Sequence, residues 1–357
     1  MILKKEEQLA LSLRERYERC GYRLFKMSKF EEYDFYIRNK EALTGSGIIT
    51  FTDTTGKLMA LMPDVTLSII KHARDTVGAV QKVYYNENVY RVSPSAHCFK
   101  EIPQTGLECM GDIDLTSVYE VVRLALDSLA AVSKDAVLDI SHLGLLSELL
   151  APVDSALQSE ICRLLSQKNS HELSAVCTAA GLSQKLTDTL CKLTTLYGTP
   201  AQVLPQLEAL LAPSKALQEL KNLTDLLPQE QLLHIDPSVT DDMNYYNGFV
   251  FKGFVRGVPE HILSGGQYDK LMHRMGHSGG AIGFALYPDR LERMEEAEAP
   301  VDADILLLYD DKADIKALMQ AAEALRQEGS VMLQKVCPLG LRFHKILHFS
   351  EGRVSEK

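Results

Sequence analysis

Two adjacent tyrosines, Tyr245 and Tyr246, lie between a polar stretch and an apolar one in the segment VTDDMNYYNGFVFK, residues 239–252. The polar side chains directly before them are Asp241, Asp242 and Asn244. The apolar run after them predicts a β-strand that starts at the tyrosines. Carboxylates, an amide and phenol rings at the mouth of a strand form either a solvated loop or the rim of a small-molecule pocket. This segment alone leaves both interpretations open.

Two histidine pairs at i,i+4 spacing could face a metal ion, namely His273 with His277 and His344 with His348. Neither pair belongs to an H-E-x-x-H motif, and Gly276 interrupts the first. The seven cysteines include no C-x-x-C pair, which is typical of reduced thiols and not of disulfides or zinc ligands. We therefore expect no metal and no cofactor.

The composition limits the class of protein. A chain of 357 residues is long enough for two or three domains, and 46% hydrophobic with 24% charged residues is typical of a soluble globular protein. The sequence has no apolar run of about eighteen residues, so we expect no membrane span. Its charged N-terminal stretch predicts an amphipathic helix and not a signal peptide, and therefore a cytoplasmic location. A net charge of −10 without a dense Lys/Arg cluster argues against nucleic-acid binding.

The elements that must position the polar residues follow from the periodicity of the sequence. Ile48–Thr52 and Leu58–Met62 predict a hairpin around the turn Asp-Thr-Thr-Gly. Pro63 and Asp64 then mark the start of a helix, with the carboxylate near its positive end. Further strand-like runs and a helix follow up to residue 142, which together predict an antiparallel sheet with helices, an α+β fold.

The texture of the sequence changes three times after this first part, residues 1–142. Leucines at three- and four-residue spacing over 143–232 predict an all-helical insertion. The strand pattern resumes over 233–297, as a second part of the same core. Residues 301–357 predict a short α/β segment that begins strand, helix, strand.

Four stretches, in this order, resemble the catalytic core of the class II histidyl-tRNA synthetases: LMPDVT (61–66), NVYRVS…CFKEIPQTGLE (88–108), MNYYNGFVF (243–251), and SGGQYDKL with AIGFALYPDRL (264–291). The resemblance implies a class II synthetase-like sheet and a histidine pocket. In such a pocket carboxylates hold the α-ammonium and an imidazole N–H, glutamine supplies neutral hydrogen bonds, and tyrosines frame the ring. The residues that the resemblance assigns to the pocket are Asp64, Thr66, Arg91, Gln104, Glu108, Tyr245 and Tyr246.

The positions with which such synthetases activate histidine depart from the family pattern. Asp241 stands where the family has a catalytic arginine, and a carboxylate opposes the negative charge that develops on ATP. Ser93 replaces the acidic residue of motif 2, and Tyr287 replaces a glycine of motif 3, of which Arg290 remains. The C-terminal segment is also shorter than the family's anticodon-binding domain.

This pattern resembles the regulatory subunits of ATP phosphoribosyltransferase, a paralogous family that keeps the synthetase fold and lacks aminoacylation. The resemblance implies a non-catalytic subunit, without catalytic residues, that is required for the first step of histidine biosynthesis and mediates histidine feedback. The implied partners are a second copy of the chain, meeting it around Tyr22–Tyr36, and a short-form catalytic subunit in a hetero-octamer, with histidine as the effector. A histidyl-tRNA synthetase and a free-standing histidine-binding paralogue remain as alternatives.

Overall fold

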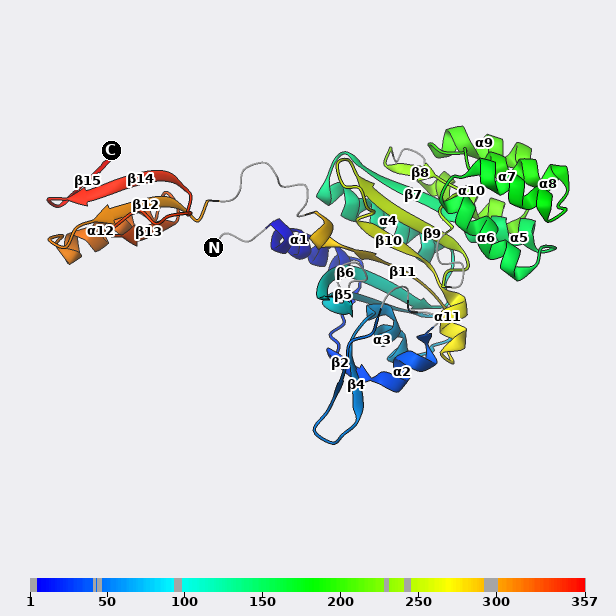
Figure 1. The fold of residues 1–357 in the computed structure, drawn as a ribbon, viewed down its shortest axis with the longest axis horizontal. Coiled ribbons are helices and arrows are strands. Elements are labelled where there is room, and N and C mark those ends of the chain that lie inside the picture. Colours follow the sequence, from blue (N-terminus) through cyan, green and yellow to red (C-terminus); the bar gives the residue numbers. More distant parts are fainter. Residues whose placement is uncertain are drawn as a thin grey trace. The chain divides into compact units, whose positions relative to one another are not determined.

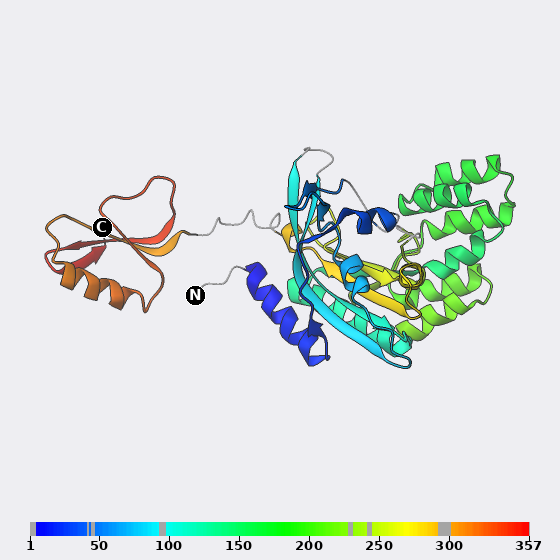
Figure 2. The same cartoon turned by 90° about the horizontal axis from the view of Figure 1, so that it is seen from below.

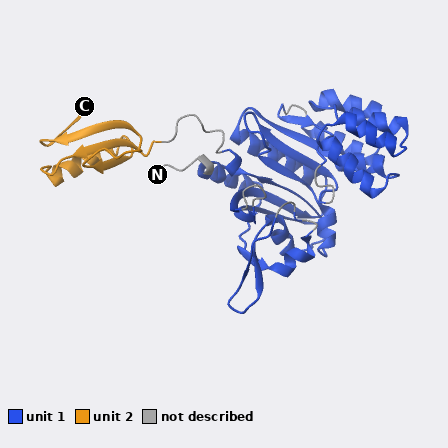
Figure 3. Ribbon diagram, in the orientation of Figure 1, with its two compact units in different colours: residues 1–293 blue, residues 294–357 orange. Residues whose placement is uncertain are grey.

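The computed structural model describes residues 5–40, 43, 47–92, 98–227, 231–240, 245–291 and 301–356. The chain divides into two compact units, Met1–Arg293 and Met294–Lys357 (Figure 3). Within the described ranges, no helix is both long and apolar enough to span a bilayer.

The first unit is built on a sheet whose described part has eight strands, in the order β1-β5-β6-β11-β10-β9-β7-β8 (Figure 1). The strands span Arg23–Leu24 (β1), Val80–Val92 (β5), Phe99–Gly111 (β6), Ala136–His142 (β7), Leu233–Ile235 (β8), Phe249–Val255 (β9), Leu263–Gln267 (β10) and Gly280–Leu286 (β11). Neighbours from β5 to β7 pair antiparallel. The parallel pairs are β1 with β5 and β7 with β8, at the two edges. The predicted antiparallel core is therefore confirmed, with a parallel strand added at each edge.

One face of this sheet is covered by the long helix α4, Leu115–Val132, together with α1, Lys5–Arg19. The Asp114 side chain caps α4 by accepting a hydrogen bond from the Ser117 backbone N–H at 2.8 Å. The helix lies so close to β9 that a Cβ at Gly253 would be 2.6 Å from Leu129, so any larger residue there would displace the Leu129 side chain.

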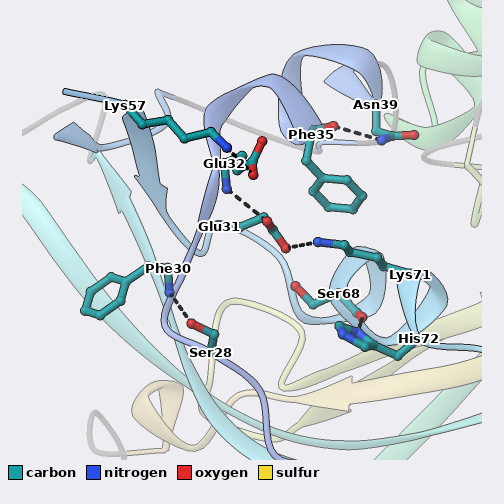
Figure 4. A network of polar contacts seen from close by, with 10 residues as sticks. All are labelled: Ser28, Phe30, Glu31, Glu32, Phe35, Asn39, Lys57, Ser68, Lys71 and His72. Carbon is teal, nitrogen blue, oxygen red and sulfur yellow. Dashed lines mark hydrogen bonds and ion pairs between the residues drawn. The ribbon is translucent and has the colours of Figure 1, made fainter. Parts of the chain in front are cut away.

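The other face carries α3, Val65–Lys71, and α11, Asp269–Arg274, which share a buried apolar cluster with β5. Beside α3 lies a small sheet of three strands in the order β2 (Phe30–Glu32), β4 (Leu58–Leu61) and β3 (Thr50–Thr52). Helix α2 (Tyr33–Arg38) lies between β2 and β3 in the sequence. The antiparallel pairing of β3 with β4 confirms the predicted hairpin. Lys71 Nζ of α3 bonds Glu31 Oε2 of β2 at 2.5 Å (Figure 4), which fastens α3 to the small sheet.

Between β7 and β8 the chain forms a group of helices at one end of the sheet, drawn in green in Figure 2. They span Leu143–Leu150 (α5), Ser155–Ser166 (α6), Ser170–Ala179 (α7), Gln184–Leu193 (α8), Pro200–Leu210 (α9) and Lys215–Leu226 (α10). Apart from Leu143 of α5, their buried leucines belong to the same apolar cluster as α4 and the sheet. The helices are therefore packed on the core and do not form a separate one.

The second unit is a small α/β fold, whose described strands run in the order β13-β12-β14-β15. Its elements are β12 (Ala303–Tyr309), α12 (Ile315–Leu325), β13 (Val331–Gln334), β14 (Phe343–Ser350) and β15 (Arg353–Glu356). The predicted strand–helix–strand opening is confirmed, with β12 and β13 parallel. A core of its own holds it together, with Leu307, Leu318 and Leu347 among its buried side chains.

Candidate functional site

A cavity of about 450 Å³ opens against the main sheet, next to the start of α3. Its walls come from segments far apart in the sequence: the N-terminus of α3, strands β5, β6, β9, β10 and β11, and the short 3₁₀ helix Pro288–Arg290. The residues assigned from the sequence all line this one cavity: Asp64, Thr66, Arg91, Gln104, Glu108, Tyr245, Tyr246 and Arg290.

Glu108, on β6, is a buried acid in the cavity wall, with 2% of its surface exposed. Its Oε1 accepts a hydrogen bond from Thr66 Oγ1 at 2.8 Å, and its Oε2 accepts one from the Tyr268 hydroxyl at 2.6 Å. The opposite position on β11 is Gly283, where a Cβ would lie 1.7 Å from Glu108 Oε2. The pKa of Glu108 is raised to about 8, chiefly by burial and to a lesser extent by the nearby Asp64 carboxylate, while the hydrogen bonds from Tyr268 and Thr66 act in the opposite direction.

Asp64 caps helix α3 and also lies beside a guanidinium group. Its Oδ1 caps α3 by accepting from the Leu67 N–H at 2.8 Å, as the predicted helix start requires. Its Oδ2 lies 4.0 Å from Arg91 Nη2, and Arg91 Nε donates to the Pro63 carbonyl at 2.9 Å. Burial raises the pKa of Asp64, and the Leu67 N–H and the Arg91 charge oppose that shift.

The two tyrosines of the opening segment lie in the cavity wall, ahead of the strand. The prediction that the strand starts at them is wrong, because β9 begins at Phe249. The rings of Tyr245 and Tyr246 meet edge to face at 4.7 Å, and Tyr245 lies 5.7 Å from Tyr268. A Cβ at Gly266 would be 2.7 Å from the Tyr246 ring, so glycine on β10 lets this ring rest on the sheet.

Gln104 is 6% exposed and lines the cavity. Its side-chain amide forms no hydrogen bond with any residue that the structure describes. Proline is tolerated at the preceding position, Pro103, because β6 pairs there with Asn88 of β5 while its pairing with β11 begins at Thr105. A buried amide facing a cavity is available to a ligand.

Tyr287, directly before the 3₁₀ helix Pro288–Arg290, also lines the cavity. Its hydroxyl bonds Ser264 Oγ of β10 at 2.9 Å, and the Arg290 guanidinium carbon lies 4.4 Å above its ring. Arg290 also donates to the His261 carbonyl, and its Nε lies 3.5 Å from Glu260 Oε2. Arg290, the arginine that motif 3 retains, is therefore held by contacts within the protein.

Tyr268 is the site residue that the sequence analysis missed, although it stands in the quoted stretch SGGQYDKL. The stretch gave its position, but only the hydrogen bond to Glu108 shows its role. Ser93 and the segment 241–244, on which part of the sequence interpretation depends, lie outside the described residues.

Three histidines of the two i,i+4 pairs have partners within the protein. His277 Nδ1 lies 3.1 Å from Asp75 Oδ1, His273 Nε2 lies 3.3 Å from the Ser278 carbonyl, and His344 Nδ1 lies 3.2 Å from Asp304 Oδ1. In the described part of the chain, no group of three or more His, Cys, Asp or Glu side chains is arranged to hold a metal ion.

Comparison with known proteins matches residues 2–291 to the family model of histidyl-tRNA synthetase. The ATP phosphoribosyltransferase regulatory subunit of Oceanobacillus iheyensis is 26% identical over 92% of this chain and 84% of its own length. The histidine–tRNA ligase of Methanocaldococcus jannaschii is 26% identical over 99% of this chain and 87% of its own.

A solved structure agrees with the fold. The ATP phosphoribosyl transferase (HisG:HisZ) complex from Thermotoga maritima contains a chain that matches with a TM-score of 0.64 at 18% identity, covering 79% of this chain and 97% of that one. The class II synthetase-like fold predicted from the sequence is thereby confirmed, as is the resemblance to the regulatory subunits. The chain belongs to the histidyl-tRNA synthetase family, and its relatives there include regulatory subunits of ATP phosphoribosyltransferase.

Proposed function

We propose that this chain is the non-catalytic regulatory subunit of an ATP phosphoribosyltransferase and that it binds histidine as an effector in the cavity around Glu108. The observation that carries the proposal is the lining of the cavity. Asp64, Gln104 and Glu108 line it together with tyrosine rings, and these side chains suit an amino acid. Arg290, which motif 3 retains, instead stacks on Tyr287 and donates to the His261 carbonyl.

The polar groups among these side chains match those of histidine. An α-ammonium group needs acceptors, which Asp64 and Thr66 supply, and the amide of Gln104 can both donate and accept. Glu108 offers a carboxyl group to an imidazole N–H, and the Tyr245 and Tyr246 rings frame an aromatic ligand.

The names of the relatives support a catalytic partner, and co-expression with a short-form ATP phosphoribosyltransferase subunit tests it. We expect a hetero-oligomer, an octamer if the resemblance holds in full, whose phosphoribosyl-ATP synthesis exceeds that of the catalytic subunit alone and falls when histidine is added. Glu108→Gln should keep the activation and lose the inhibition. Glu101→Gln is the matched control, because this exposed carboxylate on the same strand bonds Asn88 and Tyr90 and lies outside the cavity lining. Failure of the two chains to associate would contradict the proposal.

A histidyl-tRNA synthetase is the second candidate, favoured by the family model and by the similarity to a histidine–tRNA ligase. Histidine-dependent exchange of pyrophosphate into ATP separates the two. Exchange above background by the purified chain would establish the synthetase and refute the non-catalytic role.

A further inference from the structure

Glu108 lies in surroundings that favour its neutral form. It is 2% exposed, and its two hydrogen-bond partners are the hydroxyl groups of Thr66 and Tyr268, either of which can accept from a neutral acid. Within the described residues it has no ion pair. A buried carboxylate without a cation bears a large desolvation cost that two hydroxyl bonds offset only in part.

The titratable groups that face Glu108 strengthen this preference. They are Asp64 at the start of α3, Tyr85 on β5, Tyr245 ahead of β9 and Tyr268 ahead of α11. Burial raises the pKa of each tyrosine well above its usual value, so all three are neutral phenols. Arg91 hydrogen-bonds Pro63 and lies beside Asp64. The other charged side chains that line the cavity are Lys100, Lys252, Glu260, Asp289 and Arg290. The Asp64 carboxylate is the nearby charge that acts on Glu108, and it favours a proton there.

We propose that a ligand enters this cavity by displacing the Glu108 proton with its own N–H group, so that Glu108 is a neutral acid in the free protein and a carboxylate in the complex. The exchange balances: the proton leaves to the solvent, and a ligand nitrogen donates its N–H to the freed carboxylate. This inference rests on the proposed function for the identity of the ligand, histidine. It goes beyond that function because it makes binding depend on pH.

The direction of the dependence follows from linkage. Below a pKa of about 8 the free protein holds the proton that binding must expel, so histidine binds more weakly as the pH falls. For one such group the apparent affinity is about fivefold higher at pH 8 than at pH 7. The ionisation of histidine itself adds its own term, which a variant with glutamine at position 108 reports separately.

Infrared difference spectroscopy on the full chain tests the inference, because a neutral carboxylic acid has a C=O stretching band that a carboxylate lacks. At pH 7 we expect this band in the free protein, its loss on adding histidine, and its absence from Glu108→Gln. Titration of the free protein should remove the band with a midpoint near pH 8. Calorimetry on the same sample shows whether histidine binds. No heat would contradict the proposed function alone, whereas binding with no loss of the band would overturn the inference.

Two variants that retain Glu108 keep the test independent of the glutamine variant. Tyr268→Phe removes a hydrogen bond that lowers the pKa of Glu108, so the midpoint should move up. Asp64→Asn removes a like charge that raises it, so the midpoint should move down, and asparagine still caps α3. A free protein without the band at pH 7, or midpoints that do not move in these opposite directions, would overturn the inference whether or not histidine binds.

Discussion

Replacement of Glu108 by glutamine should weaken histidine binding, and the loss should grow with pH. Glutamine has nearly the same shape, and the Thr66 and Tyr268 hydroxyls can each donate or accept, so both contacts at Glu108 can persist. Loss of one partner of a buried charged pair costs about 2–5 kcal/mol. At pH 7 the wild type must also ionise Glu108, which with a pKa of about 8 costs about 1.4 kcal/mol. The net loss is then about 0.6–3.6 kcal/mol, roughly 3-fold to 400-fold in Kd.

At pH 8.5 the ionisation cost almost disappears, and the expected loss rises to about 30-fold to several thousand-fold. Isothermal titration of histidine into wild type and variant at both pH values measures this. Tyr246→Phe is the comparison, expected to lose about 1 kcal/mol because only a neutral hydrogen bond is at stake. Equal affinity of wild type and Glu108→Gln at pH 8.5 would refute the reasoning and place the effector site elsewhere, most plainly at the boundary with the catalytic subunit.

Three further predictions concern other parts of the chain. Asp139 is buried beside Asp236, and its pKa is raised to about 7, chiefly by burial and then by the Asp236 charge. The contribution of Asp139 to the stability of the fold should therefore fall as the pH rises from 4 to 7. Asp139→Asn should stabilise the fold at pH 8 by up to about 4 kcal/mol and change its stability little at pH 4, which urea denaturation at the two pH values would show. The purified chain should show no histidine-dependent pyrophosphate exchange, and Tyr287→Gly alone should not restore it, since Asp241 and Ser93 remain; exchange in either protein would be contrary to this. Sedimentation velocity at micromolar concentration should show a dimer formed around Tyr22–Tyr36, and a monomer would count against it.

The identity of the pocket residues was available from the sequence, because short motifs carry the chemistry of a site in a fixed order. LMPDVT gave both the cap of α3 and the Asp64 carboxylate, since a cap is a local feature of a few residues. The helical texture of the insertion was equally local. The exact ends of the helices were less secure, because serine is a capping residue wherever it precedes a helical pattern. Ser183 does cap α8, whereas α7 is capped by Asn169 and Ser170 is already its first residue.

What the pocket residues do to one another was decided by the tertiary structure. Glu108 meets Thr66 and Tyr268 across 42 and 160 residues of chain, and the meeting depends on the register that sets Gly283 opposite Glu108. The hydroxyl of Tyr287 finds Ser264 in the same way, across the pairing of β10 with β11. A sequence pattern records which side chains are present. The pKa of Glu108 depends instead on how much water and which charges surround it, and only the packing of strands and helices around the cavity fixes both.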